Sequence, residues 1–232
     1  MRRGFQRIFI FIGIMAALGL CGCGKKETPV REVDPEDIKV LRDFFVYDGI
    51  GFYADGLKWS DSWEDVKESR GIETADVLNE FTINDIMEGY TVKSDLWDEV
   101  PGCDTQESYS FTVGNRLSDI VVTVSISTEG AARTLLNEIL PWVKQNLPEE
   151  YSSSVLLEQE LETSIETLIN LEDGNIESMT WNAEDCSQFN IDIRGFDNTG
   201  YMEITFIIRT PEFSSSTVIR SIADWDRFSH LL

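Results

Sequence analysis

Two stretches of alternating apolar and polar residues on either side of Gly114-Asn115 constrain the fold most strongly. Tyr109, Phe111 and Val113 alternate with polar residues before this dipeptide, and residues 120–126 alternate after it. A period of two places the apolar side chains on one face of a strand. Because Gly-Asn is typical of a two-residue hairpin turn, the segment predicts an antiparallel β-hairpin with one buried face.

The same periodicity returns near the C-terminal end. Residues 189–193 and residues 202–208 alternate on either side of a turn around residues 197–200, which predicts a second hairpin. Residues 74–88 fit either a short helix or a strand. Shorter strands are predicted at residues 90–93 and 176–181.

Helix signals precede and separate these strands. Ser62, followed three residues later by Asp65, resembles a capping box and predicts a short helix that ends at Gly71. A helical apolar stripe begins at about residue 129, and a kink or break is expected at Pro141, because proline cannot donate to the helix ladder. Further helices are predicted from Asp34 to about Gly49, over residues 149–171, and at the C-terminus around Trp225.

The order helices, strands, helices, strands is typical of an α+β fold with an antiparallel sheet and helices packed on one face. Two arrangements remain open at this point. The chain forms either one long sheet or two small α+β units, residues 34–148 and residues 149–232, the second with the C-terminal helix. The hydrophobic and aromatic content is sufficient for a packed core and argues against disorder.

The N-terminal residues 1–22 have the pattern of a secretory signal peptide. Basic residues without any acidic ones precede a continuous apolar run from Ile8 to Leu20. The run is shorter than the roughly 20 apolar residues that a helix needs to span a bilayer. We therefore expect residues 1–22 to be removed and residues 23–33 to form a polar tether.

Leu20-Cys21-Gly22-Cys23 resembles the bacterial lipobox, in which a small residue directly precedes the lipid-modified cysteine. Cys23 fits this role because Gly22 is small, whereas Leu20 would be the residue before Cys21. The resemblance implies a diacylglyceryl group on the sulfur of Cys23. Since two acyl chains anchor a protein stably, we expect attachment to the cell membrane on its extracytoplasmic side.

Residues 59–66 are similar to the W-G-x-S-x-E-E-V helix start of a group of bacterial lipoproteins of uncharacterised function; Ser60 stands where that pattern has Gly. The matching residues are Trp59, Ser62, Glu64 and Val66, with Asp65 as a near match. At the level of the fold, about residues 50–210 also resemble the small domains of the β-lactamase-inhibitor protein and of the small outer-membrane-assembly lipoprotein. These resemblances imply a binding or scaffold role rather than chemistry.

The formal net charge of −23 limits the partners of the chain. Proteins that bind nucleic acids carry basic faces that neutralise phosphates, so we expect no nucleic acid partner. Anionic lipid headgroups would also repel such a chain, so the lipid on Cys23 has to hold it at the membrane.

The residues needed for common enzyme chemistry are scarce. The single histidine, His230, lies two residues from the end of the sequence, which argues against a histidine-dependent triad or a zinc site. We expect no catalysis, no metal and no cofactor. The alternative is a cell-envelope hydrolase that uses paired carboxylates, because acidic residues are abundant.

Three further residues are candidates for a structural or binding role. Cys103 and Cys186 remain after removal of the signal peptide, and in an oxidising compartment they either form a disulfide or stay free. Trp97 lies in the acidic loop from Asp95 to Glu99 and is the best candidate for an exposed contact with a protein partner.

Overall fold

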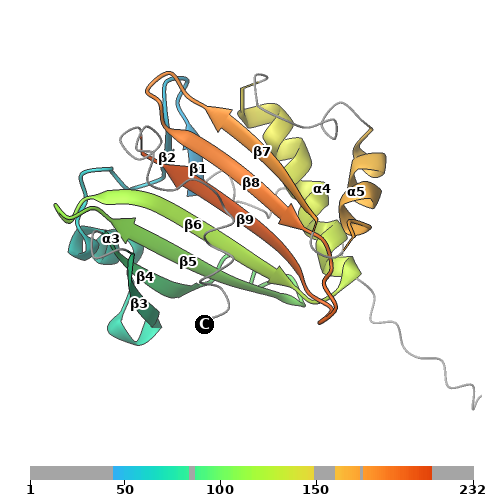
Figure 1. Cartoon of the computed structure of the whole chain (residues 1–232), viewed down its shortest axis with the longest axis horizontal. Coiled ribbons are helices and arrows are strands. Elements are labelled where there is room, and N and C mark those ends of the chain that lie inside the picture. Colours follow the sequence, from blue (N-terminus) through green and yellow to red (C-terminus); the bar gives the residue numbers. More distant parts are fainter. Residues whose placement is uncertain (1–43, 84–86, 149–159, 173–174, 211–232) are drawn as a thin grey trace, which may run out of the picture. The chain divides into compact units, whose positions relative to one another are not determined.

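A seven-stranded antiparallel sheet is the main feature of the computed structural model (Figure 1). The structure describes residues 44–83, 87–148, 160–172 and 175–210, all of them within one unit, Val33–Leu232. The predicted signal peptide, the tether, the start of the first helix and the C-terminal helix lie outside the described residues. The predicted end of the first helix, up to Gly49, is wrong: Phe45–Tyr47 forms a strand, whose Phe45 ring packs against Phe189 and Phe206 of the large sheet.

The strands of the large sheet lie in the spatial order β3-β4-β5-β6-β9-β8-β7. Their bounds are β3 (Val77–Ile83), β4 (Met87–Ser94), β5 (Cys103–Phe111), β6 (Leu117–Ile126), β7 (Ile176–Asn182), β8 (Gln188–Arg194) and β9 (Met202–Arg209). A separate two-stranded sheet consists of β1 (Phe45–Tyr47) and β2 (Phe52–Ala54).

Strand β6 pairs with β9 from Asp119 and Arg209 to Ile126 and Met202. This pairing connects the part of the chain before residue 148 to the part after it. The structure therefore has one long sheet, because the apolar faces of β6 and β9 lie side by side in a common core. The residues of that shared face are all 0% exposed: Ile120, Val122, Val124, Ile204, Phe206 and Ile208.

The hairpin predicted around Gly114-Asn115 is confirmed as β5 and β6, but its loop is longer than expected. The N–H of Thr112 donates to the carbonyl of Arg116 at 2.9 Å, which leaves three residues in the loop. Asn115 takes the left-handed conformation with a φ of 52°, as is common in three-residue hairpin loops. Val113 consequently lies in the loop and is exposed rather than in the strand.

The second predicted hairpin is confirmed as β8 and β9. The ambiguous segment 74–88 forms a short 3₁₀ turn, η1 (Thr74–Asp76), followed by β3 and the start of β4. The strand alternative is therefore correct for this segment, since β3 pairs antiparallel with β4.

Helix α3 (Trp63–Arg70) begins and ends at the residues that the sequence predicts. The hydroxyl of Ser62 accepts the N–H of Asp65, and the carboxylate of Asp65 accepts the N–H of Ser62 at 2.9 Å. Both halves of the capping box are thus present. Gly71 ends the helix with a φ of 66°, in the left-handed region that favours glycine.

Helix α4 (Glu129–Asn146) passes through Pro141 and shows no break there. Leu136, Ile139 and Leu140 of its apolar stripe are at most 1% exposed. Burial of this stripe outweighs the loss of the one hydrogen bond that proline cannot make. Helix α5 (Leu161–Ile169) confirms the described part of the helix predicted over residues 149–171.

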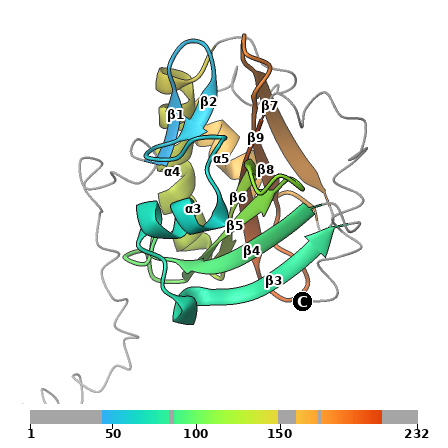
Figure 2. The same cartoon turned by 90° about the vertical axis from the view of Figure 1, so that its left-hand side faces the viewer.

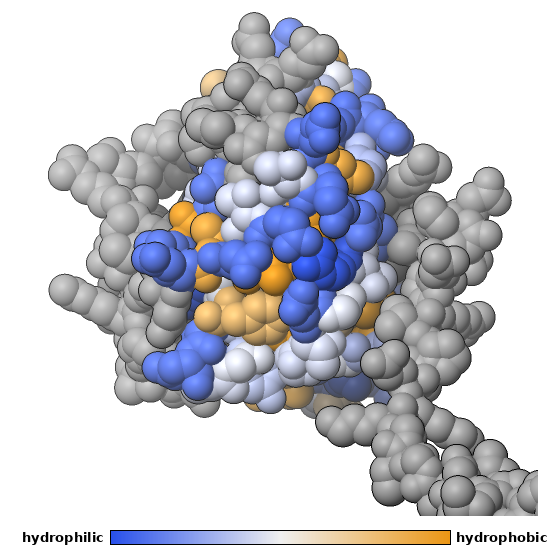
Figure 3. Space-filling view, turned by 90° about the vertical axis from the view of Figure 1, so that its right-hand side faces the viewer, coloured by the Kyte–Doolittle hydropathy of each residue, from blue (hydrophilic) through white to orange (hydrophobic). Residues whose placement is uncertain are grey.

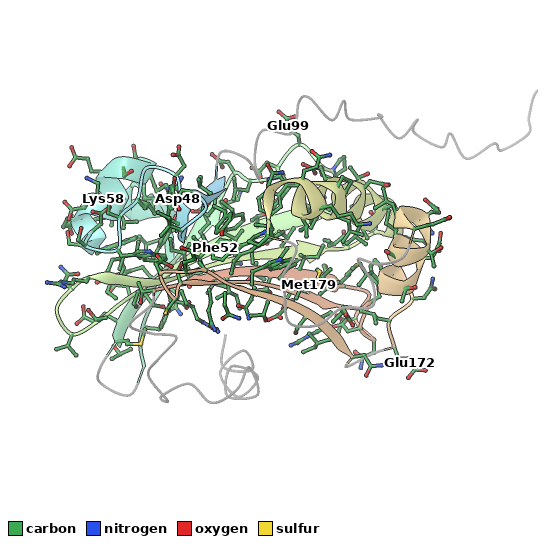
Figure 4. The ribbon with its side chains drawn as sticks, turned by 90° about the horizontal axis from the view of Figure 1, so that it is seen from above. Asp48, Phe52, Lys58, Glu99, Glu172 and Met179 are labelled. Atoms are coloured by element: carbon green, nitrogen blue, oxygen red, sulfur yellow. The ribbon has the colours of Figure 1, made fainter. Side chains whose placement is uncertain are left out.

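Helices α3 and α4 and the β1–β2 hairpin lie on the same side of the large sheet, as the sequence predicts (Figure 4). Helix α5 packs beside α4, where Arg133 pairs with Glu129 at 2.8 Å and with Glu166 at 2.7 Å. The core fills the space between this helical layer and the sheet. Among the described elements, no helix lies below the middle of the opposite sheet face (Figure 4).

We predict that Ser62→Ala lowers the free energy of unfolding by about 1 kcal/mol, because the first turn of α3 loses its side-chain acceptor. Urea denaturation followed by circular dichroism measures this change. Ser60→Ala, at an exposed position just before the helix, is the matched control and should leave stability within about 0.5 kcal/mol. Equal effects of the two substitutions would contradict a stabilising cap.

Candidate binding surface

Cys23, the predicted lipidation site, lies outside the described residues, so its role remains a prediction. Within the described ranges, no helix has the length and apolar character needed to cross a membrane. The remaining predicted site residues, Trp97, Cys103 and Cys186, are all described.

Trp97 is buried, and its prediction as an exposed contact is wrong. Its side chain is 4% exposed and stacks on Phe206 of β9, with ring centroids 5.7 Å apart. The acidic residues next to it, Asp98 and Glu99, point to solvent, while the backbone at Trp97 takes a φ of 60°. The acidic composition of this loop favours exposure to solvent. Burial of the large indole ring outweighs this tendency and sets the conformation of the loop.

The carboxyl group of Glu138, on α4, lies close to Trp97 in a half-buried position. Burial raises the pKa of Glu138 to about 7, and the indole of Trp97 partly offsets this effect. Burial, and then the charge of Glu138, raise the pKa of the Cys103 thiol to about 12. Burial is thus the main cause that raises the pKa of both acidic groups.

Cys103 and Cys186 are not joined to each other by a disulfide. Cys103 pairs with Ile126 at one end of the sheet, whereas Cys186 lies in the turn just before Gln188, which pairs with Arg209 at the other end. A disulfide requires Cα atoms within about 7 Å of each other. The length of a strand separates these two residues, so the disulfide alternative is not formed in this structure.

The sheet face opposite the helices carries a buried charged group of side chains. Arg209 of β9 lies 3.4 Å from Asp119 of β6. The charge of Arg209 is also one of the causes that lower the pKa of Asp192 on β8. Burial nevertheless raises the pKa of both aspartates. Asp119 is 3% exposed and Asp192 is 8% exposed. These carboxylates therefore compensate a buried guanidinium and have little access to a substrate.

A second arrangement lies where α3 packs against β4, next to β3 (Figure 2); its Trp63 is buried, while Tyr90 is half-buried. Trp63, the first residue of α3, stacks on Tyr90 of β4 with centroids 4.2 Å apart and an interplanar angle of 1°. Lys67 lies over the Trp63 ring, 5.7 Å from its centroid, and pairs with Glu64 at 2.7 Å. The cap at Ser62 sets the start of α3 and thereby positions the Trp63 ring.

Tyr90 is half-buried and lies among carboxylates. It pairs directly with Glu80 of β3, and Glu88 of β4 pairs with Thr82 of the same strand. Burial raises the pKa of the Tyr90 hydroxyl, and the charges of Glu88 and Glu80 add to the effect. The surroundings of the ring are thus negative and would favour a cationic group.

A shallow groove of about 770 Å³ lies along the same helix, and Lys67, which lies over the Trp63 ring, is one of its lining residues. It is lined by α3 and by residues 71–75, which lead into β3, and it includes the carboxylates of Glu64, Glu68 and Glu73. We call the groove, the Trp63–Tyr90 pair and β3 together the α3–β3 surface. On another side of the molecule, which carries β7 and α5, hydrophobic atoms lie in small patches among hydrophilic ones (Figure 3).

Sequence reasoning found part of the α3–β3 surface and missed the rest. The capping box and Trp63 were visible in the pattern from residue 59 to residue 66. Tyr90, Glu80 and Glu88 were not, because only the β3–β4 register brings them together. Among the described residues, no cluster of histidine, cysteine or acidic side chains could hold a metal ion.

No family model, no curated protein and no solved structure matches this chain. The similarity to uncharacterised lipoproteins therefore remains a prediction from residues 59–66.

We predict that Glu138→Gln makes the protein more stable above pH 7. The folded-state pKa of Glu138 is raised from 4.5 to about 7, so ionisation costs more in the folded than in the unfolded state. The unfolding free energy of the native chain should fall as the pH rises from 4.5 to 7. The variant lacks this loss and should gain about 2–3 kcal/mol above pH 7, with little difference below pH 4.5.

Urea denaturation at a series of pH values measures this effect. Glu99→Gln, which removes an exposed carboxylate from the neighbouring loop, controls for the loss of one charge. A stability difference between Glu138→Gln and the native chain that does not depend on pH would contradict the assignment.

Proposed function

We propose that the protein is a lipid-anchored extracytoplasmic lipoprotein that acts as a binding or scaffold module at the cell envelope. The observation that carries this proposal is Leu20-Cys21-Gly22-Cys23 after a basic and then apolar N-terminal segment. A thiol at Cys23 supplies the nucleophile that a diacylglyceryl group would alkylate. Residues 23–33 would then tether the folded part to the membrane on its outer side.

The charge of the chain supports a lipid anchor over electrostatic adsorption. A formal net charge of −23 opposes contact with anionic headgroups, whereas two acyl chains anchor a protein stably without any basic patch. The same charge would attract a cationic partner and speed its association.

The α3–β3 surface supports a binding role. It brings the half-buried ring of Tyr90, the exposed carboxylates of Glu80 and Glu88, and the groove along α3 to one part of the described structure. A protein partner at the envelope is the occupant that this combination favours, because aromatic residues are enriched in protein contacts and complementary charges steer the partner into place.

A second candidate is the cell-envelope hydrolase with paired carboxylates, and Asp119 and Asp192 on either side of Arg209 favour it. We prefer the binding role because both carboxylates are less than one-tenth exposed, and a catalytic carboxylate has to reach its substrate. Incubation of the full chain with peptidoglycan and polysaccharides should give no turnover. Turnover that Asp192→Asn abolishes would favour the hydrolase instead.

We predict that Cys23→Ser abolishes incorporation of a labelled fatty acid and releases the protein from the membrane fraction. Only the thiol of Cys23 has the small residue Gly22 before it, which the lipobox requires. Metabolic labelling and fractionation of cells that express the full chain measure both effects. Cys21→Ser is the matched control and should keep the label. Labelled Cys23→Ser protein would overturn the anchor assignment.

A further inference from the structure

We infer that the outer edge of β3 accepts an extended, basic segment of a partner protein as an added antiparallel or parallel strand. This inference deepens the proposed binding function and rests on it, but it does not depend on the lipid anchor. It identifies the partner by its chemistry, namely an extended backbone that carries lysine or arginine side chains.

Strand β3 is an outermost strand of the seven-stranded sheet, and its neighbour among the described strands is β4. It is seven residues long, from Val77 to Ile83. The outer edge of such a strand offers backbone N–H and C=O groups that an extended peptide can pair with. Figure 2 shows β3 along the margin of the described sheet. Helix α3 lies next to β4 and not beyond the outer edge of β3.

The side chains of β3 suit contact with an added strand. The β3–β4 register shifts between Val77 and Asn79, so Leu78 lies at an irregularity and is 54% exposed. Glu80 and Thr82 are also exposed, at alternate positions along the same strand. Leu78 would pack against an apolar side chain of the added strand, while Glu80 would meet a side chain directly opposite it.

Charge complementarity selects a basic partner. Glu80 is exposed and lies directly opposite Tyr90 in the β3–β4 register. The exposed Glu88 lies two residues before Tyr90, and Lys67 already pairs with Glu64 at 2.7 Å. A lysine or arginine on the added strand would therefore find the carboxylate of Glu80 and the ring of Tyr90 together. Cross-strand ion pairs and cation–π contacts each stabilise such an arrangement.

A second copy of this chain fits the edge less well. Full antiparallel pairing of β3 with itself, Val77 opposite Ile83, would place Glu80 directly opposite Glu80 of the other copy. Like charges at directly opposed positions destabilise a strand pair. Two chains that each carry a net charge of −23 would also repel each other before contact.

The experiment selects random short peptides displayed on phage against the full mature chain in detergent micelles. The enriched peptides should carry lysine or arginine at alternate positions and bind more weakly as the salt concentration rises. Synthetic copies of the best peptide should slow hydrogen exchange of the β3 amides. The same peptide with alternate backbone amides methylated should bind at least about tenfold more weakly.

Glu80→Lys should weaken binding of the unmodified peptide by about three- to tenfold, because an attractive pair becomes a repulsive one. Glu99→Lys, which makes the same charge change at an exposed residue of the β4–β5 loop, is the control and should change binding less than twofold. Both variants should keep the circular dichroism spectrum of the native chain.

Three results would overturn the inference: no enrichment of basic peptides, peptide binding that Glu80→Lys and Glu99→Lys weaken equally, or unchanged exchange of the β3 amides. A partner crosslinked to the lipid-labelled chain in membranes, together with any of these results, would leave the proposed function intact. Absence of both the lipid label and a crosslinked partner would instead contradict the proposed function itself.

Discussion

The pairing of β6 with β9 is the interaction on which the rest of the structure depends. Strand β6 lies near the middle of the described sequence and β9 near its C-terminal end, and their shared inner face is fully buried. Their contact closes a core that neither half of the chain encloses alone, and burial of large apolar side chains supplies most of its stability. Helix α4 then packs on this face through Leu136 and Ile139, although Pro141 interrupts its hydrogen bonding.

The same pairing determines which strands become edges. Because β6 and β9 occupy the middle of the order, β3 and β7 are left at its two ends. The α3–β3 surface follows from this arrangement, since α3 needs the inner faces of β4 and β5 for Trp63 but does not extend over the outer edge of β3. The outermost strand β3 of the described sheet, the Tyr90 ring and the carboxylates of α3 therefore meet at one place, although they come from separate segments of the sequence.

The acidic residues of this chain fall into two physical classes. At exposed helix and turn positions, hydrogen bonds to the charged form hold the pKa low, as Ser62 does for Asp65. At Glu138, Asp119 and Asp192 burial acts in the opposite direction and raises the pKa. The exposed carboxylates thus carry the high negative charge that influences which partners can bind. The buried carboxyl groups instead influence the stability of the fold.

The sequence by itself determined the elements whose causes are local. The cap at Ser62, the stop at Gly71, the hairpin at residues 109–126 and the α+β class follow from side-chain periodicity and backbone preferences within a few residues. Only the tertiary structure decided that one sheet spans the chain, that Trp97 is buried on Phe206, and that Tyr90 lies among carboxylates. Each of these depends on strand register and on contacts between distant segments, which local composition does not encode.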